Sequence, residues 1–335
     1  MKLKIFFGMV CATSFVLTFG FLAHYGGGQR AAPLFVPAPV LAEVPKETYV
    51  QEEKSAKLLF VGDLLFDRTV RTHIERSGGA HLFSKVMPLF ASVQAVVGNL
   101  EGPITAHPSV SRASNVGEPN NTRFTFHPEA ATILRDAGFT LVSLGNNHMA
   151  DFGREGASST RAYLEQAGVA YVGDPFDADN TLTWQEVHGI RIAFVGYNEF
   201  IRAAPEGTRA AIGRARLEGA DFIVVLAHWG DEYTSVPPSR VRRLAGTFSA
   251  AGSDLIIGTH SHVIGETENI GKTRVFYSLG NFIFDQYWEE SVRCGLVIEV
   301  TLQKTRAATH ATYQEHRTHL ERDGATTLSC PLLQG

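Results

Sequence analysis

The sequence predicts an α/β fold in which two mixed sheets pack against each other, with helices on the outside. From Lys57 onward, short apolar runs rich in β-forming residues alternate with helical patterns. Helical segments separate several of these runs, whereas others follow each other as hairpins, so the strands run in both directions. The chain has 335 residues, of which 44% are hydrophobic and 19% charged, a composition typical of one large globular domain.

The N-terminus predicts a signal anchor over residues 1–24. Lys2 and Lys4 precede an apolar run from Ile5 to Ala23, which is close to the ~17–25 residues of a membrane span. Because the positive flank stays in the cytoplasm, we expect a single-pass protein of the cell membrane whose main domain is extracytoplasmic. A cleaved signal, giving a secreted or periplasmic protein, stays open because residues 40–42 (VLA) resemble a cleavage site.

The rest of the chain divides into three predicted parts. Residues 25–56 are rich in Gly, Pro and Ala without a sustained period, so they predict a linker. Residues 57–320 form the main domain, and residues 321–335 form a C-terminal tail. Outside the cytoplasm Cys294 and Cys330 can form a disulfide, but two cysteines do not establish one, so this pairing stays open.

Strands are predicted wherever a short apolar run is bounded by turn residues. In chain order these runs are KLLFV at 57–61, QAVVG at 94–98, FTLVSLG at 139–145, RIAFVGY at 191–197, DFIVVLAHW at 221–229, DLIIG at 254–258 and RVFYSLG at 274–280. Residues 184–197 suggest a hairpin that turns at Gly189, and residues 295–303 followed by 308–316 suggest another antiparallel pair. Helices are predicted over residues 153–167 and 239–251, each ending near a glycine.

Charge and absent motifs exclude several function classes. The net charge is −4 and the basic residues are scattered, so no nucleic-acid partner is expected. There is no G-x-x-x-x-G-K-[ST] loop, no G-x-G-x-x-G after a strand, no G-x-S-x-G elbow and no H-E-x-x-H helix. A nucleotide kinase, a dinucleotide oxidoreductase and a serine hydrolase therefore lose their main support.

Polar residues able to perform chemistry cluster where the predicted strands end. Ligands of open α/β sheets collect at the carboxyl ends of strands, so these residues can converge on one site. Imidazole, carboxylate and amide ligands together suit Mn, Fe or Zn. His260 and His262 lie two residues apart and share a face of an extended chain. The residues concerned are Asp63, Asn99, Glu101, Asn147, His148, His228, His260, His262 and Asn281.

Several of these residues also have a structural interpretation. Asp63 can cap the helix that begins near Asp67, and Asn99 and Glu101 can be turn residues. His228 can be a core histidine, and His148 with Asp151 can mark a helix start. Independent caps and core histidines need not all fall at strand ends, however, so their co-occurrence favours a single site.

Six motifs in this order resemble those of the CapA-type (PgsA) capsule-biosynthesis proteins, which are associated with poly-γ-glutamate. The resemblance runs from about Lys57 to Asp285 and rests on FVGDLLFDR, GNLEGPI, LGNNHMADFG, AHWGDEY, IGTHSHV and YSLGNFIFDQ. That family is related to the calcineurin-like metallophosphoesterases. The resemblance implies a metallo-dependent phosphatase-like fold, a four-layer α-β-β-α sandwich of two mixed sheets, and a site that holds two metals.

The resemblance also implies roles for individual residues. Asp63 matches the first metal-binding Asp and Asn147 the Asn of the second metal, while Asn146 more readily shapes the turn. Glu101 falls at the position of the bridging Asp, with Asn99 as its competitor. The later histidine ligands are matched by His228, His260 and His262.

One departure from the phosphoesterase pattern concerns the first strand. Those enzymes have Asp-x-His there, whereas this chain has Leu65 in place of the histidine. Whether the site holds one or two divalent ions therefore stays open. His148 matches the histidine that protonates a leaving group, and Asp151 or a backbone carbonyl would fix its tautomer.

These features predict a membrane-tethered, metal-dependent hydrolase acting on an anionic envelope polymer in capsule or poly-γ-glutamate metabolism. The bond cleaved, phosphoester or γ-glutamyl amide, stays open. Two alternatives are a non-catalytic subunit that binds other capsule-synthesis subunits in a membrane complex, and a phosphodiesterase unrelated to capsule. The expected substrate-binding residues are Arg68, Trp229, Glu232, Tyr233 and Asn281.

Overall fold

The computed structural model describes residues 53–201 and 204–330, and these residues belong to one compact unit. The predicted anchor over residues 1–24 and most of the predicted linker lie outside this part of the chain. No helix among the described residues is long and apolar enough to cross a membrane.

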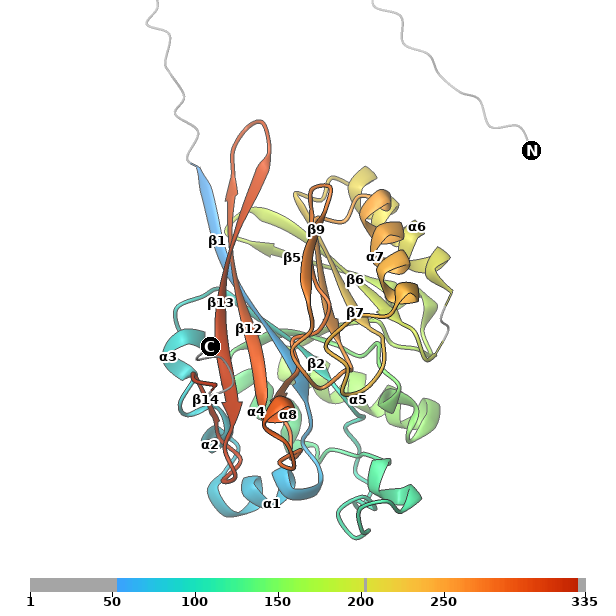
Figure 1. Ribbon diagram of the computed structural model, residues 1–335, viewed down its shortest axis with the longest axis vertical. Coiled ribbons are helices and arrows are strands. Elements are labelled where there is room, and N and C mark those ends of the chain that lie inside the picture. The colour runs from blue at the N-terminus through green and yellow to red at the C-terminus, as the bar shows by residue number, and fades with distance from the viewer. Residues whose placement is uncertain (1–52, 202–203, 331–335) are drawn as a thin grey trace, which may run out of the picture. The chain divides into compact units, whose positions relative to one another are not determined.

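The first sheet is mixed and has eight strands in the described part of the chain (Figure 1). Its order is β14-β13-β12-β1-β2-β3-β4, and β11 also pairs with β1. The strands β1 to β4 and β11 run parallel, whereas β12, β13 and β14 are antiparallel neighbours. Their bounds are β1 Lys54–Leu64, β2 Ala95–Leu100, β3 Phe139–Ser143, β4 Ala170–Val172, β11 Asn281–Ile283, β12 Cys294–Lys304, β13 Thr309–Leu320 and β14 Thr326–Thr327.

The second sheet is also mixed, with the order β5-β6-β7-β8-β10-β9. Its four inner strands are parallel, and an antiparallel strand closes each edge. The bounds are β5 Leu182–Val187, β6 Ile190–Asn198, β7 Phe222–His228, β8 Leu255–Thr259, β9 Thr267–Ile270 and β10 Thr273–Phe276.

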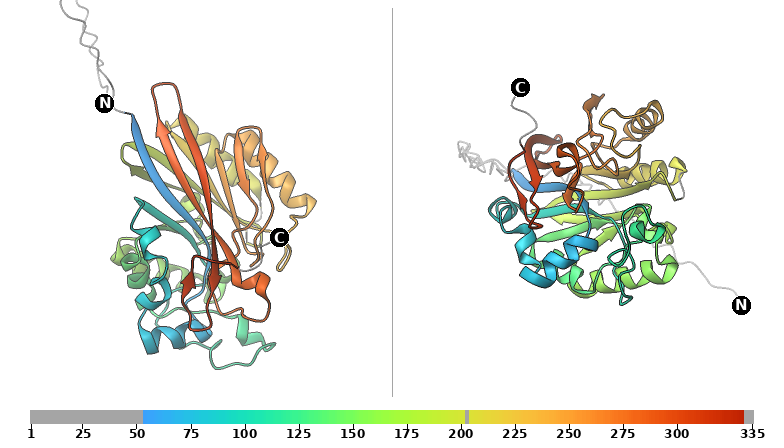
Figure 2. Two further views of the ribbon diagram at one scale, coloured as in Figure 1. Left: turned by 60° about the vertical axis from the view of Figure 1, so that its left-hand side comes forward. Right: turned by 60° about the horizontal axis from the view of Figure 1, so that its bottom comes forward.

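Helices cover the outer faces of both sheets (Figure 2). The helices α1, α2, α4 and α5 contribute buried side chains to the core outside the first sheet, and α6 and α7 contribute to the core outside the second. The bounds are α1 Arg68–Ser77, α2 Ala80–Phe83, α3 Met87–Phe90, α4 Glu129–Asp136, α5 Gly153–Ala167, α6 Pro205–Leu217, α7 Ser239–Ala251 and α8 Glu290–Arg293. Short 3-10 turns are η1 Pro119–Thr122, η2 His148–Ala150 and η3 Ala178–Thr181.

A third core fills the space between the sheets. Along β1, Leu58 and Phe60 belong to this inner core, whereas Leu59 and Val61 belong to the core under the helices. Successive side chains of a strand point to opposite faces, so a run that is apolar at every position is buried on both sides. The layers are thus helix, sheet, sheet and helix, and the predicted fold class is confirmed.

The predicted local elements are confirmed at most positions. The two helices predicted in full have the predicted bounds, and each ends at a glycine in the left-handed conformation, Gly168 and Gly252. The hairpin of β5 and β6 turns through His188 and Gly189, whose φ angles are 49° and 74°. Positive φ at both central residues matches a tight hairpin turn, which glycine tolerates best.

The described part of the predicted tail over residues 321–335 is attached to the domain. After β13 the chain turns back, and β14 pairs with β13 through Leu320 and Thr326. The hydroxyl of Thr326 donates to the carbonyl of Phe282. Cys330 forms a disulfide with Cys294 at the start of β12, which resolves the pairing that the sequence left open. At the other end, β1 begins at Lys54, inside the predicted linker.

The substitution Cys330→Ser is expected to lower the free energy of unfolding by about 4 kcal/mol, because the disulfide closes a loop between residues 36 apart. Urea unfolding of oxidised wild type and variant measures this difference. Under a reducing agent the two proteins should unfold alike, because neither then has the cross-link. Equal stability under oxidising conditions would contradict a structural role for this disulfide.

Candidate metal centre

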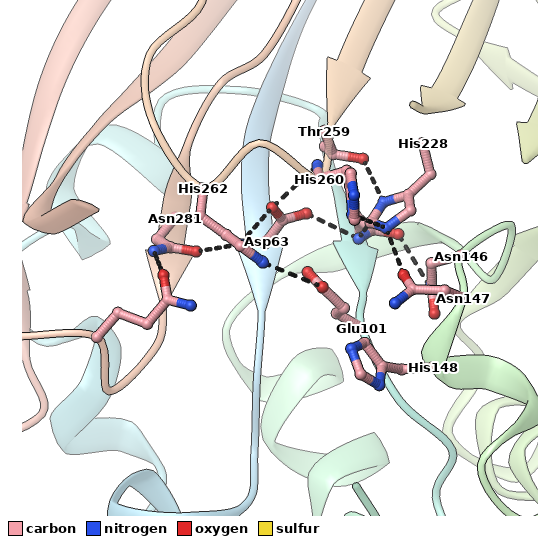
Figure 3. Close-up of polar contacts among 12 residues, drawn as sticks. Asp63, Glu101, Asn146, Asn147, His148, His228, Thr259, His260, His262 and Asn281 are labelled. Atoms are coloured by element: carbon pink, nitrogen blue, oxygen red, sulfur yellow. Dashed lines mark hydrogen bonds and ion pairs between the residues drawn. The ribbon is translucent and has the colours of Figure 1, made fainter. Parts of the chain in front are cut away.

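The polar residues predicted at strand ends meet at one edge of the sandwich (Figure 3). The first sheet supplies Asp63 near the end of β1 and Glu101 just beyond β2. The second supplies His228 at the end of β7 and His260 just beyond β8. Because the carboxyl ends of parallel strands from both sheets face the same region, segments far apart in sequence form one site.

One set of possible metal ligands consists of Glu101, His228 and His260. One ligand atom from each residue lies within 4.8 Å of the others. His228 Nε2 lies 3.1 Å from His260 Nδ1 and 2.8 Å from Asn147 Oδ1. The amide oxygen of Asn147 is therefore positioned to be a fourth ligand of this group.

A second set consists of Asp63, Glu101 and His262, whose ligand atoms also lie within 4.8 Å of one another. His262 Nδ1 lies 2.9 Å from Asn281 Oδ1 and 3.3 Å from Asp63 Oδ2. A proton on Nδ1 can be donated to the Asn281 oxygen, which leaves the lone pair on Nε2, 3.6 Å from Glu101 Oε1. Asn281 thereby orients a possible ligand.

Glu101 belongs to both sets and is fully buried, with neither carboxylate oxygen hydrogen-bonded within the described structure. Burial, and then the charge of Asp63, raise the pKa of Glu101 well above its usual range. A buried carboxylate is costly unless a partner satisfies it, and a cation between the two sets would do so. The donor set therefore fits one or two divalent cations with Glu101 shared.

Asn99, the alternative to Glu101 as a metal ligand, forms hydrogen bonds with neighbouring side chains instead. Its Nδ2 donates to Asp63 Oδ1 at 2.8 Å, and its Oδ1 accepts from Asn146 Nδ2 at 3.1 Å. Asn146 also donates to the carbonyl of Leu100 and accepts from the amide of Met149. Both asparagines thus fix the surrounding loops, and Asn146 shapes its turn.

Two of the histidines are buried and neutral at ordinary pH. Burial, reinforced by neighbouring imidazoles, holds the pKa of His228 well below its usual value. The same causes lower the pKa of His260 to about 4. Neutral imidazoles offer lone pairs to a cation, so protons compete with metal at these ligands only in acidic solution.

The N-cap of helix α1 is Asp67 and not Asp63. Asp67 caps α1, accepting the amide of Arg68 at 2.9 Å through one oxygen and the hydroxyl of Ser111 at 2.7 Å through the other. Leu65, at the position of the missing histidine, is fully buried in the core under the helices. The group around Asp63 is completed by Glu101 and His262 instead.

His148 lies beside this site with its orientation fixed. Its Nδ1 is 3.0 Å from Asp151 Oδ2, and its ring centroid lies 4.2 Å from that of Phe124. The same Asp151 oxygen accepts the amide of Phe124 at 2.7 Å. This arrangement favours a proton on Nδ1, so Nε2 is left as the ring nitrogen that can exchange a proton.

The predicted substrate-binding residues separate into two groups. Arg68, Glu232 and Tyr233 line a cleft of about 590 Å³ together with His148 and His262. Trp229 does not, because it is 1% exposed, packs in the core outside the second sheet and donates its Nε1 proton to Tyr277 O. Asn281 is buried and orients His262, so it does not line the cleft either.

Sequence reasoning missed several side chains at the site. The ring of Phe200 lies 4.2 Å from that of His260, between centroids, and Thr259 Oγ1 lies 3.0 Å from His228 Nδ1. Thr259 directly precedes a motif histidine and could have been inferred from that position. Phe200 has no such signal, because it comes from a loop without a motif.

Backbone strain is concentrated at this site. Among the described residues other than glycine, those with positive φ are Arg68, Tyr233, His260, His262 and, in the hairpin turn, His188. Such residues usually cost free energy and persist where the surrounding structure requires them. Of the four at the site, His260 and His262 are possible metal ligands, and Arg68, Tyr233 and His262 line the cleft.

Known proteins match this chain over most of its length. Residues 57–286 match the family described as "Bacterial capsule synthesis protein PGA_cap". The "PGA biosynthesis protein CapA" of Bacillus subtilis (strain 168) is 34% identical over 76% of the chain and 70% of its own length. The "Capsule biosynthesis protein CapA" of Bacillus anthracis is 30% identical over 74% of the chain and 64% of its own length, so the chain spans less than two thirds of that relative.

One solved structure resembles this chain only loosely. TT1561 of Thermus thermophilus is 13% identical, covers 77% of the chain and 98% of its own, and has a TM-score of 0.42, too low to carry an argument. The family match instead covers residues 57–286, which include all the residues of the candidate metal centre. The chain belongs to the family of bacterial capsule synthesis proteins.

Proposed function

We propose that this protein is a metal-dependent hydrolase of capsule metabolism that acts on poly-γ-glutamate or a similar anionic envelope polymer. The observation that carries this proposal is the carboxylate of Glu101, which is buried, without a hydrogen bond in the described structure, and common to two groups of metal ligands. Such a carboxylate is hard to explain in a purely structural site.

The two groups would hold divalent cations of the Mn, Fe or Zn type, because their donors are imidazole nitrogens and carboxylate or amide oxygens. One group is Glu101, His228 and His260 with the amide of Asn147, and the other is Asp63, Glu101 and His262. A cation bound there would supply Lewis-acid stabilisation of developing negative charge and an acidified water.

The residues around these groups would handle the proton and the substrate. Nε2 of His148 would hold the proton that the leaving group takes, with Asp151 fixing the ring from the other side. Arg68 and Tyr233 would position the substrate in the cleft beside His148. The same geometry serves a γ-glutamyl amide or a phosphoester.

The choice of poly-γ-glutamate as the proposed substrate polymer rests on the names of the relatives. "PGA" and "capsule" stand in the names of the CapA proteins, and residues 57–286 match the capsule synthesis family. We also propose that residues 1–24 anchor the protein in the cell membrane with its main domain outside. The disulfide between Cys294 and Cys330 supports an oxidising compartment.

A non-catalytic assembly subunit is the second candidate, favoured by one observation. Leu65 occupies the place of a usual ligand and its side chain is buried away from the site. A protein kept only for binding or assembly tolerates such a loss. Turnover therefore has to be measured separately from metal binding.

Metal removal is expected to lower the melting temperature of the purified protein, and metal addition to restore it. A ligand at 100 times its Kd stabilises a protein by about 2.7 kcal/mol. Metal content, melting temperature, and hydrolysis of γ-glutamyl oligomers and of an aryl phosphodiester are measured for wild type, His260→Ala and His316→Ala. His316 on β13 pairs with Glu299 on β12 and belongs to neither ligand group, so its variant is the control that should keep metal.

Four outcomes of this experiment are distinct. Metal together with γ-glutamyl hydrolysis, both lost in His260→Ala, supports the proposal. Hydrolysis of the phosphodiester alone supports the third candidate, a phosphodiesterase unrelated to capsule. Metal without turnover favours the assembly subunit, and absence of both metal and turnover contradicts the hydrolase.

A further inference from the structure

The cleft beside the metal centre has an unusual mixture of side chains. It has a volume of about 590 Å³, within the ~300–1,000 Å³ typical of ligand sites. Hydroxyl and amide side chains line it along with two arginines, Arg68 and Arg112. It also contains a group of aromatic residues, which are Phe124, Tyr233, Phe284 and Trp288.

Two of these aromatic rings form an exposed platform. Trp288 is 63% exposed and Tyr233 is 48% exposed, and the rings meet edge to face with centroids 5.8 Å apart. Large aromatic side chains are rarely left so open unless they contact a partner. Neither ring belongs to a described core cluster.

The platform is fixed to the metal centre. The amide of Tyr233 donates to the carbonyl of Ser261, which lies between the possible ligands His260 and His262, at 2.8 Å. Its hydroxyl accepts from Gln286 Nε2 at 3.2 Å, and Gln286 Oε1 accepts from Asn281 Nδ2 at 2.9 Å. A substrate packed on Tyr233 is therefore held at a set place relative to the cations.

Both arginines of the cleft are paired with carboxylates. Arg68 pairs with Asp285 at 2.5 Å, and Arg112 pairs with Glu75 at 2.5 Å. Glu232 adds another negative charge to the lining. Arg68 retains a donor, because its buried Nε has no hydrogen-bond partner among the described residues. The cleft thus offers separated guanidinium groups and no continuous positive field.

This mixture discriminates among polymers. A densely charged polyphosphate or nucleic acid requires a continuous basic surface, which the paired arginines do not supply. A neutral glycan would use the aromatic platform and leave the guanidinium groups without a role. Carboxylates separated by amide and methylene groups suit both features, since arginine binds carboxylates bidentately and aromatic rings pack on uncharged stretches.

We propose that this cleft is a subsite for several consecutive units of a chain whose carboxylates are separated by uncharged amide and methylene groups. Trp288 and Tyr233 pack on the uncharged stretches, and Arg68 and Arg112 bind carboxylates. The subsite holds the chain beside the metal centre, and in this respect the inference rests on the proposed function.

Tryptophan fluorescence tests the subsite without any turnover. The chain has three tryptophans, and Trp288 is the exposed one. Trp229 is buried. Trp184 lies on β5 of the second sheet, and the guanidinium of Arg191 covers its ring. Acrylamide quenching of the metal-free full-length protein is measured with γ-glutamyl oligomers of increasing length, with a neutral oligosaccharide and with polyphosphate.

Long γ-glutamyl oligomers are expected to protect the fluorescence from quenching, with affinity rising with length. Trp288→Phe should lose the protected signal. Trp288→Ala should bind ~3–10-fold more weakly by calorimetry, the loss of one aromatic contact. Arg112→Gln should weaken the γ-glutamyl oligomer selectively, while Trp184→Phe, the matched control, should behave as wild type.

No protection by γ-glutamyl oligomers, or equal protection by the neutral oligosaccharide or by polyphosphate, would overturn the subsite. Its failure is distinguishable from failure of the proposed function, because binding is read without metal. If γ-glutamyl oligomers protect Trp288 from quenching but the metal-loaded protein does not hydrolyse them, only the hydrolase proposal is refuted. Hydrolysis without protection of Trp288 refutes the subsite alone.

Discussion

Substitution of Glu101 by glutamine is expected to weaken divalent-cation binding strongly and to raise the melting temperature of the metal-free protein. The carboxylate is the ligand common to both groups, so its loss should weaken binding beyond the ~10–100-fold that loss of an outer partner costs. Metal analysis and calorimetry measure the first effect, and thermal unfolding after chelation measures the second.

The stabilising effect follows from the sign of the pKa shift. Burial raises the pKa of Glu101 in the folded protein, so ionising this group at neutral pH costs the folded state free energy. An unsatisfied buried polar group costs ~1–3 kcal/mol, and more when charged, and glutamine removes the charge. The gain over wild type should shrink as the pH falls from the raised folded-state pKa of Glu101 toward 4.5, the ordinary pKa of a glutamate, and should be lost below 4.5, where Glu101 is protonated in both folded and unfolded chains. Cation binding by wild type should correspondingly release protons.

Glu299→Gln provides a matched control with the opposite sign. Hydrogen bonds from Lys57 and His316 lower the pKa of Glu299, so its charge stabilises the folded protein above the unfolded pKa. Its replacement should lower the melting temperature slightly, because Lys57 is partly exposed, and should leave metal content unchanged. A Glu101→Gln protein that binds metal like wild type, or melts at lower temperature without metal, would contradict the shared-ligand role.

Substitution of His148 by glutamine should lower kcat by ~10²–10⁴-fold while leaving metal content unchanged. The ring lies beside the cleft, and its hydrogen bond to Asp151 and its contact with Phe124 position it without making it a member of either ligand group. Single-turnover rates with γ-glutamyl oligomers, together with metal analysis, measure the two effects.

The leaving group provides a sharper test of the His148 role. A substrate whose leaving group needs no proton should be cleaved by His148→Gln nearly as fast as by wild type, because general-acid assistance is then dispensable. An equal loss on both kinds of substrate would argue that His148 holds the substrate instead. Loss of metal in this variant would argue that it is a ligand.

Much of the fold and the position of the site follow from the sequence, because strands buried on both faces stand out as apolar runs. Asp63 and His228 lie at the ends of such strands and His260 directly follows one, and parallel strands must bring their carboxyl ends together. Asn99 lies within β2, whereas Glu101 is the first residue beyond that strand, and it is Glu101 that reaches the candidate metal centre. A pattern of residues cannot resolve that choice, because it depends on how the chain bends after the strand.

Trp229 illustrates an error that the sequence could have prevented. It directly follows His228, and adjacent residues of an extended chain point to opposite faces. If His228 points to the site, Trp229 points to the outer core, where the structure places it. Trp288 was missed for another reason, since an exposed aromatic residue in a loop has no periodic partner that reveals its surroundings.

A bound cation would also link the two sheets to each other. Asp63 and Glu101 come from the first sheet, whereas His228 and His260 come from the second. A cation held by both sets would be a cross-link between the layers, and any unfolding route that parts them at this edge would first have to break it. Loading with metal would then slow unfolding as well as shift its equilibrium, so the lifetime of the folded protein would depend on the supply of metal.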